Sequence, residues 1–171
     1  MKDTTKILSE EHKIILRVIA KLKIECDAIT SGKQPDSKFL LNAIDFIRNY
    51  ADKFHHAKEE DILFKEFSKL KNLHCNPVDQ MLYEHDLGRK FVKEIEQGLN
   101  EKDKNKITEG IRNYAGLLEE HIYKEDNILY PMIEAEIDDK NKKIILEKFK
   151  EINVQKKKEN EKYLKFADES K

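Results

Sequence analysis

The sequence contains few residues that break helices: its 171 residues include only five glycines and three prolines. Many-stranded sheets need frequent turns, so this scarcity disfavours an all-β fold. The only cysteines, Cys26 and Cys75, are far apart and form no disulfide framework, which indicates reduced thiols. No stretch approaches the about 18 apolar residues of a transmembrane helix. No apolar segment typical of a signal peptide follows Met1, so we expect a cytoplasmic protein with no membrane partner.

Charge is abundant but balanced. Charged residues make up 39% of the chain and hydrophobic residues another 39%, and the formal net charge is −1. This composition is typical of amphipathic helices with solvated outer faces. Because neither sign dominates, the chain has no basic field that would attract nucleic acid or an anionic membrane. The length is sufficient for one domain with a hydrophobic core.

Apolar residues recur at helical spacing and predict five helices, over about residues 5–30, 36–70, 77–99, 103–137 and 140–167. Short connections between long helices are typical of antiparallel neighbours. We therefore predict an all-α fold: an antiparallel up-and-down four-helix bundle over residues 1–137, followed by a C-terminal helical extension over residues 138–171. The last helix has a thinner apolar face. Its position does not follow from the pattern, and we expect its outer half to fray.

Residues that begin or end helices lie between these segments. Gly32 is suited to end the first helix, and Asp36 is suited to cap the second. Asn76 and Pro77 together predict the start of the third, with Asn76 as the cap and proline at the first helical position. Pro131 is expected either to bend the fourth helix or to end it early.

The chain also repeats itself. Residues 55–64 and 121–130 align without a gap, and both read His-x-x-Lys-Glu-acid-x-Ile-Leu-aromatic. In each copy the histidine and glutamate are four residues apart, so they lie on one face of a helix. A fainter repeat in the preceding helices centres on His12 and His85. The predicted bundle therefore consists of two helix pairs related by a pseudo-two-fold axis.

Six polar side chains in this pattern point toward the predicted core: His12, His55, Glu59, His85, His121 and Glu125. Buried polar groups are costly unless they satisfy one another or bind a ligand. Four imidazoles and two carboxylates cannot all do so by mutual hydrogen bonds without strain, whereas two cations solve the problem. Each metal would take two imidazoles, both carboxylates would bridge, and an oxide or hydroxide bridge would leave one position open on each ion. This donor set suits iron, manganese or zinc.

These motifs resemble those of the hemerythrin-like (HHE cation-binding) proteins, and the resemblance covers about residues 5–137. It implies a four-helix bundle with a non-haem di-iron centre. Residue by residue, it implies that His12, His55, His85 and His121 are terminal ligands and that Glu59 and Glu125 are bridges. Zinc or manganese remains compatible with the same ligands.

One position departs from the oxygen carriers of this family. Where they have a fifth histidine, one turn after the third-helix histidine, this sequence has Arg89; one turn before it lies Met81. The chain thus resembles the four-histidine, two-glutamate branch. That resemblance implies binding or reduction of a small oxidant (oxygen, hydrogen peroxide or nitric oxide), with an electron donor that the sequence does not identify. A non-enzymatic oxygen or iron sensor, an iron store, and an iron donor for repair of iron–sulfur centres are the alternatives.

Neighbouring polar residues have competing interpretations. His56 and Glu60 form a second pair at the same spacing, which we interpret as surface residues or as residues behind the ligands. Glu11 and Glu84 each precede a predicted ligand histidine, and one interpretation makes them acceptors for ring N–H groups behind the ligands. Adjacent helical residues diverge by about 100°, so we expect both glutamates to be solvent-exposed.

Five further residues complete the set of candidates. Tyr114 is expected either to donate to a ligand on the metal or to pack with its hydroxyl at the end of the bundle. Gly88 would leave room for a diatomic ligand or let two helices approach. We expect His74 to be solvated, Cys75 to be an incidental loop cysteine, and Cys26 to fill the core.

Overall fold

The computed structural model describes residues 3–70 and 77–169, and within these ranges the backbone forms helices and turns but no strand. The predicted all-α class is therefore confirmed. The elements, in chain order, are α1 (Lys6–Thr30), α2 (Ser37–Phe46), the π-helical segments η1 (Ile47–His56) and η2 (Glu59–Leu63), α3 (Phe64–Phe67), α4 (Val78–Glu101), α5 (Lys104–Lys124), the π-helical segment η3 (Glu125–Leu129), α6 (Tyr130–Glu136) and α7 (Asp139–Asp168).

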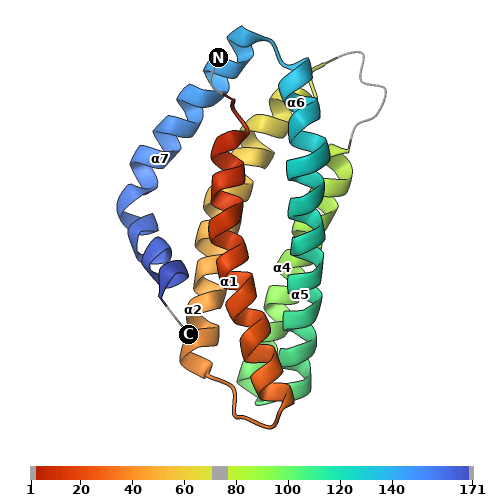
Figure 1. Ribbon diagram of the computed structural model, residues 1–171, viewed down its shortest axis with the longest axis vertical. Coiled ribbons are helices and arrows are strands. Elements are labelled where there is room, and N and C mark those ends of the chain that lie inside the picture. Colours follow the sequence, from red (N-terminus) through yellow and green to blue (C-terminus); the bar gives the residue numbers. More distant parts are fainter. Residues whose placement is uncertain (1–2, 71–76, 170–171) are drawn as a thin grey trace.

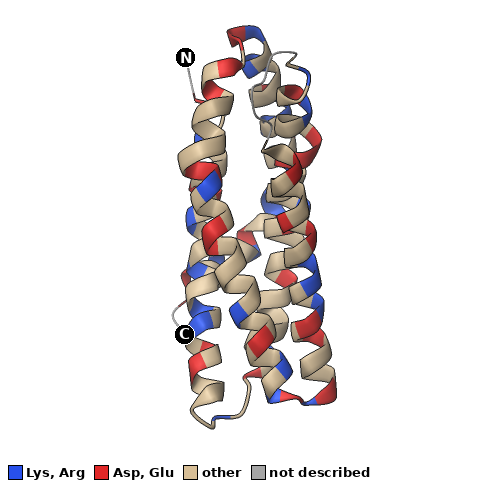
Figure 2. Cartoon of the chain, turned by 90° about the vertical axis from the view of Figure 1, so that its right-hand side faces the viewer, with Lys and Arg blue, Asp and Glu red and all other residues tan. Residues whose placement is uncertain are grey.

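The long helices lie side by side. In Figure 1 the chain descends along α1, rises from α2 to α3, descends in α4, rises from α5 to α6 and descends again in α7. Contacts join α1 to α2 and α5, and α4 to α2 and α5. Charged side chains of both signs are interspersed along the helices (Figure 2), as the composition predicts. None of the described helices combines the length and the apolar character needed to cross a bilayer.

The helix ends follow the local sequence. Gly32 adopts a φ of 98°, the left-handed conformation that suits glycine after a helix. The carboxylate of Asp36 accepts a hydrogen bond from the backbone N–H of Phe39 at 3.0 Å, so the predicted cap of α2 is confirmed. Pro77 lies immediately before α4, one residue earlier than predicted. The expected cap at Asn76 lies outside the described residues, as do His74 and Cys75.

Pro131 does not end the fourth helical stretch, which continues to Glu136. The π-helical segment η3 immediately precedes α6, and Pro131 lies in the first turn of α6. Proline is tolerated there because the first turn of a helix does not need its N–H for the helical hydrogen-bond ladder. The expectation of an early end at this residue was therefore wrong.

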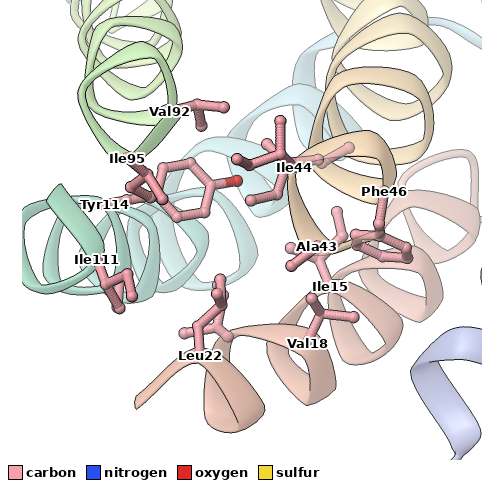
Figure 3. Packing of buried hydrophobic residues seen from close by; sticks show 14 of the residues in the cluster. Ile15, Val18, Leu22, Ala43, Ile44, Phe46, Val92, Ile95, Ile111 and Tyr114 are labelled. Carbon is pink, nitrogen blue, oxygen red and sulfur yellow. The ribbon is translucent and has the colours of Figure 1, made fainter. Parts of the chain in front are cut away.

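Buried side chains form two hydrophobic clusters, one on each side of a polar layer. Figure 3 shows part of the larger cluster, which includes Ile15 of α1, while the smaller one includes Leu8 of the same helix. His12 lies between them along α1, so apolar packing excludes water on both sides of its level. Cys26 is buried in the larger cluster, with its thiol 3.6 Å from the carbonyl oxygen of Thr108, and its predicted role as core filler is confirmed.

Helix α7 packs against α1, η1 and η2, a position that the sequence did not reveal. Ile145 and Phe149 belong to the smaller cluster, and Tyr163 and Ala167 belong to the larger one. The expectation that its outer half frays was wrong, because Tyr163 and Ala167 are only 3% and 2% exposed. Widely spaced anchors along 30 residues replace the continuous apolar stripe that the sequence lacks.

We predict that Phe149→Ala lowers the free energy of unfolding by about 3–5 kcal/mol, the usual range for removing a fully buried aromatic side chain. Phe149 is 0% exposed. Denaturant unfolding followed by circular dichroism measures the change. Val154→Ala is the matched control on the same helix, because Val154 is 69% exposed. It should change stability by less than about 0.5 kcal/mol. Equal effects of the two substitutions would show that α7 does not pack as described.

Candidate metal centre

The six side chains that the sequence predicts as metal ligands meet in the layer between the two hydrophobic clusters. Each is at most 2% exposed. The ring centroids of His12 and His55 are 4.6 Å apart, and those of His85 and His121 are 4.7 Å apart. The four imidazoles thus form two pairs, one from each repeat half. Glu59 and Glu125 are the other two of the six residues, and both form a group with His12 and His55 that could hold a metal ion. Ligation of a metal by this set remains a prediction.

Each of the two glutamates lies between histidines from both helix pairs. Glu125 Oε2 is 3.2 Å from Nε2 of His12 and 3.3 Å from Nε2 of His121. Glu59 Oε2 is 3.6 Å from Nε2 of His55 and 3.5 Å from Nε2 of His85. The carboxylates therefore occupy the central positions that bridging ligands require, while the imidazoles surround them.

A second layer of carboxylates holds the far side of each imidazole. The Nδ1–carboxylate oxygen distances are 3.0 Å for His12–Asp126, 3.0 Å for His55–Glu11, 2.8 Å for His85–Glu60 and 2.7 Å for His121–Glu84. An ionised carboxylate can only accept, so each Nδ1 carries the hydrogen and donates it. Each Nε2 is then left with a lone pair directed at the centre, which is the arrangement of a histidine that binds metal.

Glu11 and Glu84 were expected at the surface, and this was wrong: they are only 6% and 5% exposed. The 100° divergence between neighbours does separate Glu11 from the ring of His12. It also turns the carboxylate toward the adjacent helical stretch, where Glu11 reaches His55. Glu84 reaches His121 in the same way. The prediction took into account the direction of each glutamate on its own helix, but not the histidine of the neighbouring helical stretch that the glutamate faces.

The lysine of the repeated motif binds these same carboxylates. Lys58 donates to Glu11, and Lys124 donates to Glu84. These contacts explain the motif His-x-x-Lys-Glu-acid. The acidic residue after the glutamate accepts from a histidine on another helix. The lysine binds the carboxylate that accepts from the histidine of the same motif. The two copies differ in exposure, since Lys58 is fully buried and Lys124 is 34% exposed.

Both central glutamates begin a π-helical segment: η2 starts at Glu59 and η3 at Glu125. A π-turn inserts one residue into the helical ladder and commonly marks a functional site. Here it lies between the histidine–glutamate pair and the apolar residues that follow. The repeat thus extends from the sequence to the backbone.

The residues fit a pair of cations better than they fit one another. Both carboxylate oxygens of Glu125 and one of Glu59 are buried with no hydrogen-bond partner among the described residues. Nε2 of His85 lies 3.0 Å from Nε2 of His121. With their hydrogens on Nδ1, two acceptor lone pairs would face each other there. Unpaired anions and opposed lone pairs are costly in a dry interior, and divalent cations would relieve both.

Without metal, the centre perturbs its own protonation. Burial lowers the pKa of His12, but its contacts with Asp126 and Glu125 outweigh burial and raise that pKa to about 9. Burial, reinforced by the nearby charge of Glu125, raises the pKa of Glu59 well above its usual value. Burial also lowers the pKa of His55 well below its usual value. In the metal-free chain, His12 and Glu59 therefore carry protons where cations would otherwise balance the charge, while His55 stays neutral.

His56 is buried, with 7% of its surface exposed, so its interpretation as a surface residue was wrong. Its ring stacks on that of His85, with centroids 3.8 Å apart and planes inclined by 13°. Its ring nitrogens can form a further group with His85 and His121. Glu60 does not pair with His56 but accepts from His85 and from Arg89. The stack places His56 behind a predicted ligand.

Sequence reasoning missed Tyr130, whose hydroxyl donates to Glu59 and lies 3.4 Å from Nε2 of His12. Its ring is nearly parallel to that of His12. A signal was present, because the aromatic position of the repeat holds Phe64 in one copy and tyrosine in the other. Phe64 stacks on His85, so the two aromatics are equivalent except for one hydroxyl.

Tyr114 matches neither expectation fully. Its ring belongs to the larger cluster, and its hydroxyl points into the interior toward Ile44 rather than lying at the end of the bundle (Figure 3). The hydroxyl has no hydrogen-bond partner among the described residues. The packing role of the Tyr114 ring is therefore confirmed, whereas its hydroxyl forms no hydrogen bond with a residue of the predicted metal centre.

A sequence model of one protein family, described as the hemerythrin HHE cation binding domain, matches residues 3–133. The chain belongs to this family. The match includes all six predicted ligands and ends before α7 begins at Asp139. Membership in the hemerythrin family agrees with a buried histidine–glutamate group that can hold metal. Searches of curated proteins and of solved structures found no match.

The unequal burial of the two lysines leads to a prediction. Glu11→Gln removes the charge that pairs with the buried Lys58, and it should lower the free energy of unfolding of the metal-free protein by about 3–5 kcal/mol. Glu84→Gln leaves Lys124 free to turn to solvent, and it should cost only about 1–2 kcal/mol. Denaturant unfolding in the presence of a chelator compares the two.

Both substitutions should also weaken metal binding about 10–100-fold, because each deprives an imidazole of its charged acceptor. Competition with a chromophoric chelator measures this, with Glu119→Gln on the exposed face of α5 as the control. Equal losses of stability in the two variants would contradict the asymmetry. Unchanged metal affinity would contradict the role assigned to the outer carboxylates.

Proposed function

We propose that this hemerythrin-domain protein holds a non-haem di-iron centre that binds or reduces a small oxidant: oxygen, hydrogen peroxide or nitric oxide. The proposed terminal ligands are His12, His55, His85 and His121, and the proposed bridges are Glu59 and Glu125. Zinc and manganese are alternatives for the same ligands. An antiparallel up-and-down four-helix bundle, with α7 as an additional helix, is part of the proposal.

One observation carries the proposal: the two carboxylates lie between four imidazoles whose opposite nitrogens are held by a second layer of carboxylates. Two histidines per ion and two shared glutamates leave coordination positions for a further ligand. Arg89 occupies the sequence position of a fifth histidine, and its guanidinium is bound by Asp52 and Glu60. A guanidinium stays protonated, so it offers no lone pair to a metal.

Bound iron would supply open coordination positions and the electrons that reduce such a ligand. The chain's own residues supply the surroundings. The hydrophobic clusters on either side exclude water from the layer. The hydroxyl of Tyr130 donates its proton to Glu59, and its oxygen lies 3.4 Å from Nε2 of His12, so this residue holds one proton at a proposed bridge. Turnover would need an electron donor, which we leave unidentified. The interspersed charges support neither nucleic acid nor a membrane as the partner, and a cytoplasmic location belongs to the proposal.

A sensor is the second candidate, and one contact favours it. The buried Lys58 binds Glu11, behind His55, and also donates to Asn153 of α7 at 2.9 Å. A change at the centre can therefore reach the C-terminal helix through three side chains. An iron store and an iron donor for repair of iron–sulfur centres use the same ligands and differ only in how readily the metal leaves.

We predict that protein reconstituted anaerobically with ferrous iron contains about two iron ions per chain, as a two-metal site requires. His121→Ala should remove at least one of them, because it deletes a terminal ligand that also contacts a bridge. Tyr123→Ala, two residues away on α5 and 64% exposed before substitution, is the control. Elemental analysis measures the metal. A single ion per chain, or full loading of the histidine variant, would refute the di-iron centre.

A second experiment distinguishes the functions. The reduced, loaded protein is exposed separately to oxygen, hydrogen peroxide and nitric oxide while its optical spectrum is recorded. Repeated consumption of an oxidant in the presence of a chemical reductant supports an enzyme, and reversible binding supports a sensor or carrier. Transfer of iron to an apo iron–sulfur protein supports repair. A spectrum unchanged by all three oxidants would exclude the first proposal.

A further inference from the structure

A cavity of about 280 Å³ opens beside the metal centre, between α4, α5 and the stretch that includes η1. Its buried lining includes the rings of His56, His85 and Tyr114. Apolar walls come from Ile47, Val92 and Leu118. The lining residues most exposed to solvent are lysines, and the two carboxylates of the lining, Asp52 and Glu84, already pair with Arg89 and Lys124. The cavity therefore has a cationic mouth, apolar walls and a floor with a few polar groups.

The size of the cavity exceeds what a diatomic ligand needs. One water molecule requires about 10–15 Å³ of such volume, and oxygen or nitric oxide is only slightly larger. Sites for small organic molecules begin at about 300 Å³ and combine apolar walls with a few placed polar groups. The cavity beside His85, at about 280 Å³, lies just below this second class in size and matches it in lining.

Gly88 keeps this space open without being needed for helix packing. A Cβ atom there would lie 3.7 Å from the Tyr114 ring and 3.8 Å from Leu117, which are ordinary contacts. At Gly98 and Gly110, by contrast, a Cβ would lie 2.8 Å from atoms of the neighbouring helix. Close approach of α4 and α5 therefore explains Gly98 and Gly110 but not Gly88. The absence of a side chain at Gly88 instead leaves the cavity unfilled.

One buried polar atom of the lining has no partner among the described residues, the hydroxyl of Tyr114, whereas Nδ1 of His56 makes only a long contact of 3.5 Å with Asp52. Both side chains are more than nine-tenths buried. Unpaired buried polar groups are uncommon because each loses its hydration without compensation. Burial, with a further contribution from Asp52, raises the pKa of Tyr114, so the phenol keeps its proton and acts as a donor. An occupant with an acceptor oxygen would satisfy it.

The charge at the mouth indicates the sign of the occupant. Lys53 and Lys93 line the cavity and are exposed, and neither forms an ion pair with a carboxylate in the described part of the chain, although Lys53 donates to the amide oxygen of Asn49 at 3.4 Å. Arg89, by contrast, is already neutralised by Asp52, Glu60 and Asp86. Two unpaired ammonium groups at the entrance of an apolar cavity favour a ligand with one negative charge.

We infer that this cavity binds a small organic monocarboxylate that carries a second oxygen beyond its apolar body. The carboxylate lies at the lysines of the mouth, the carbon chain lies against Ile47, Val92 and Leu118, and the second oxygen accepts from the Tyr114 hydroxyl. The site shares His85 and Glu84 of its lining with the metal centre, but the contacts inferred for the ligand use neither residue. Binding can therefore be tested in the metal-free and the metal-loaded protein, and its outcome is independent of the proposed oxidant chemistry.

Calorimetric titration with four probes of equal chain length tests the inference: levulinate (a keto acid), pentanoate, pentanol and pentylamine. Levulinate should bind with a dissociation constant in the range of about 0.01–1 mM, as ligand efficiencies of small molecules allow. Pentanoate, which lacks the second oxygen, should bind roughly tenfold more weakly. The neutral and cationic probes should bind still more weakly. Equal binding of pentylamine, or no saturable binding of any acid, would overturn the inference.

Variants locate the binding. Gly88→Leu should abolish it by filling the cavity, whereas Gly116→Leu, at a glycine with no neighbour within 4 Å, should leave it intact. Tyr114→Phe should remove the preference for levulinate over pentanoate. This variant removes an unpaired hydroxyl and should fold at least as well as the parent. Replacing Lys53 and Lys93 with glutamine should weaken levulinate roughly fivefold, against no change for Lys90→Gln. Unaltered binding in both Gly88→Leu and Tyr114→Phe would place the ligand elsewhere.

Discussion

Hydrogen bonds between carboxylates and imidazole Nδ1 atoms determine the geometry of this protein's interior. Each joins two helical stretches that are distant in sequence, as Glu11 does with His55 and Glu84 with His121. They fix which ring nitrogen carries hydrogen, and they thereby direct four lone pairs at one point between two fully buried glutamates. The centre is costly without cations, because both carboxylate oxygens of Glu125 and one of Glu59 have no hydrogen-bond donor among the described residues. The same contacts hold the helices in register, so packing of the helices and readiness for metal depend on one set of interactions.

The gapless repeat explains how much of the site the sequence could predict. It separated His55 from the adjacent His56, and the six residues that it selected are all buried, while their role as metal ligands stays a prediction. Periodicity and turn residues also predicted the helical class and most helix ends. Glu11 and Glu84 could be recognised as possible acceptors, but the sequence favoured exposure because each turns away from the histidine beside it, and the histidine that each accepts from lies on another helix. Contacts between elements are not contained in the periodicity of one element.

The position of α7 could not be predicted from the sequence for a related reason. Its apolar residues are too widely spaced to define a stripe, and its place depends on pockets that exist only after the other helices have packed. Its packing also breaks the pseudo-symmetry of the centre. The lysine on its side, Lys58, lies between the rings of Phe54 and Phe149 and is shielded from water, while Lys124 is partly exposed. Two halves with nearly identical sequence motifs therefore have different electrostatic surroundings, so the two metal positions that we propose would not be equivalent.

The π-helical segments at Glu59 and Glu125 have an evolutionary consequence. Each inserts one residue between the histidine–glutamate pair and the aromatic residue that stacks on a histidine from another helix. Deleting one residue would restore α-helical spacing and turn the aromatic by about 100° away from its imidazole. Substitutions can accumulate in these segments one at a time, but a change in their length would rearrange every contact beyond the glutamate at once. Segments of this kind can diverge in sequence while keeping a fixed number of residues, and that fixed spacing, more than the identity of any apolar residue within it, is what distant relatives would share.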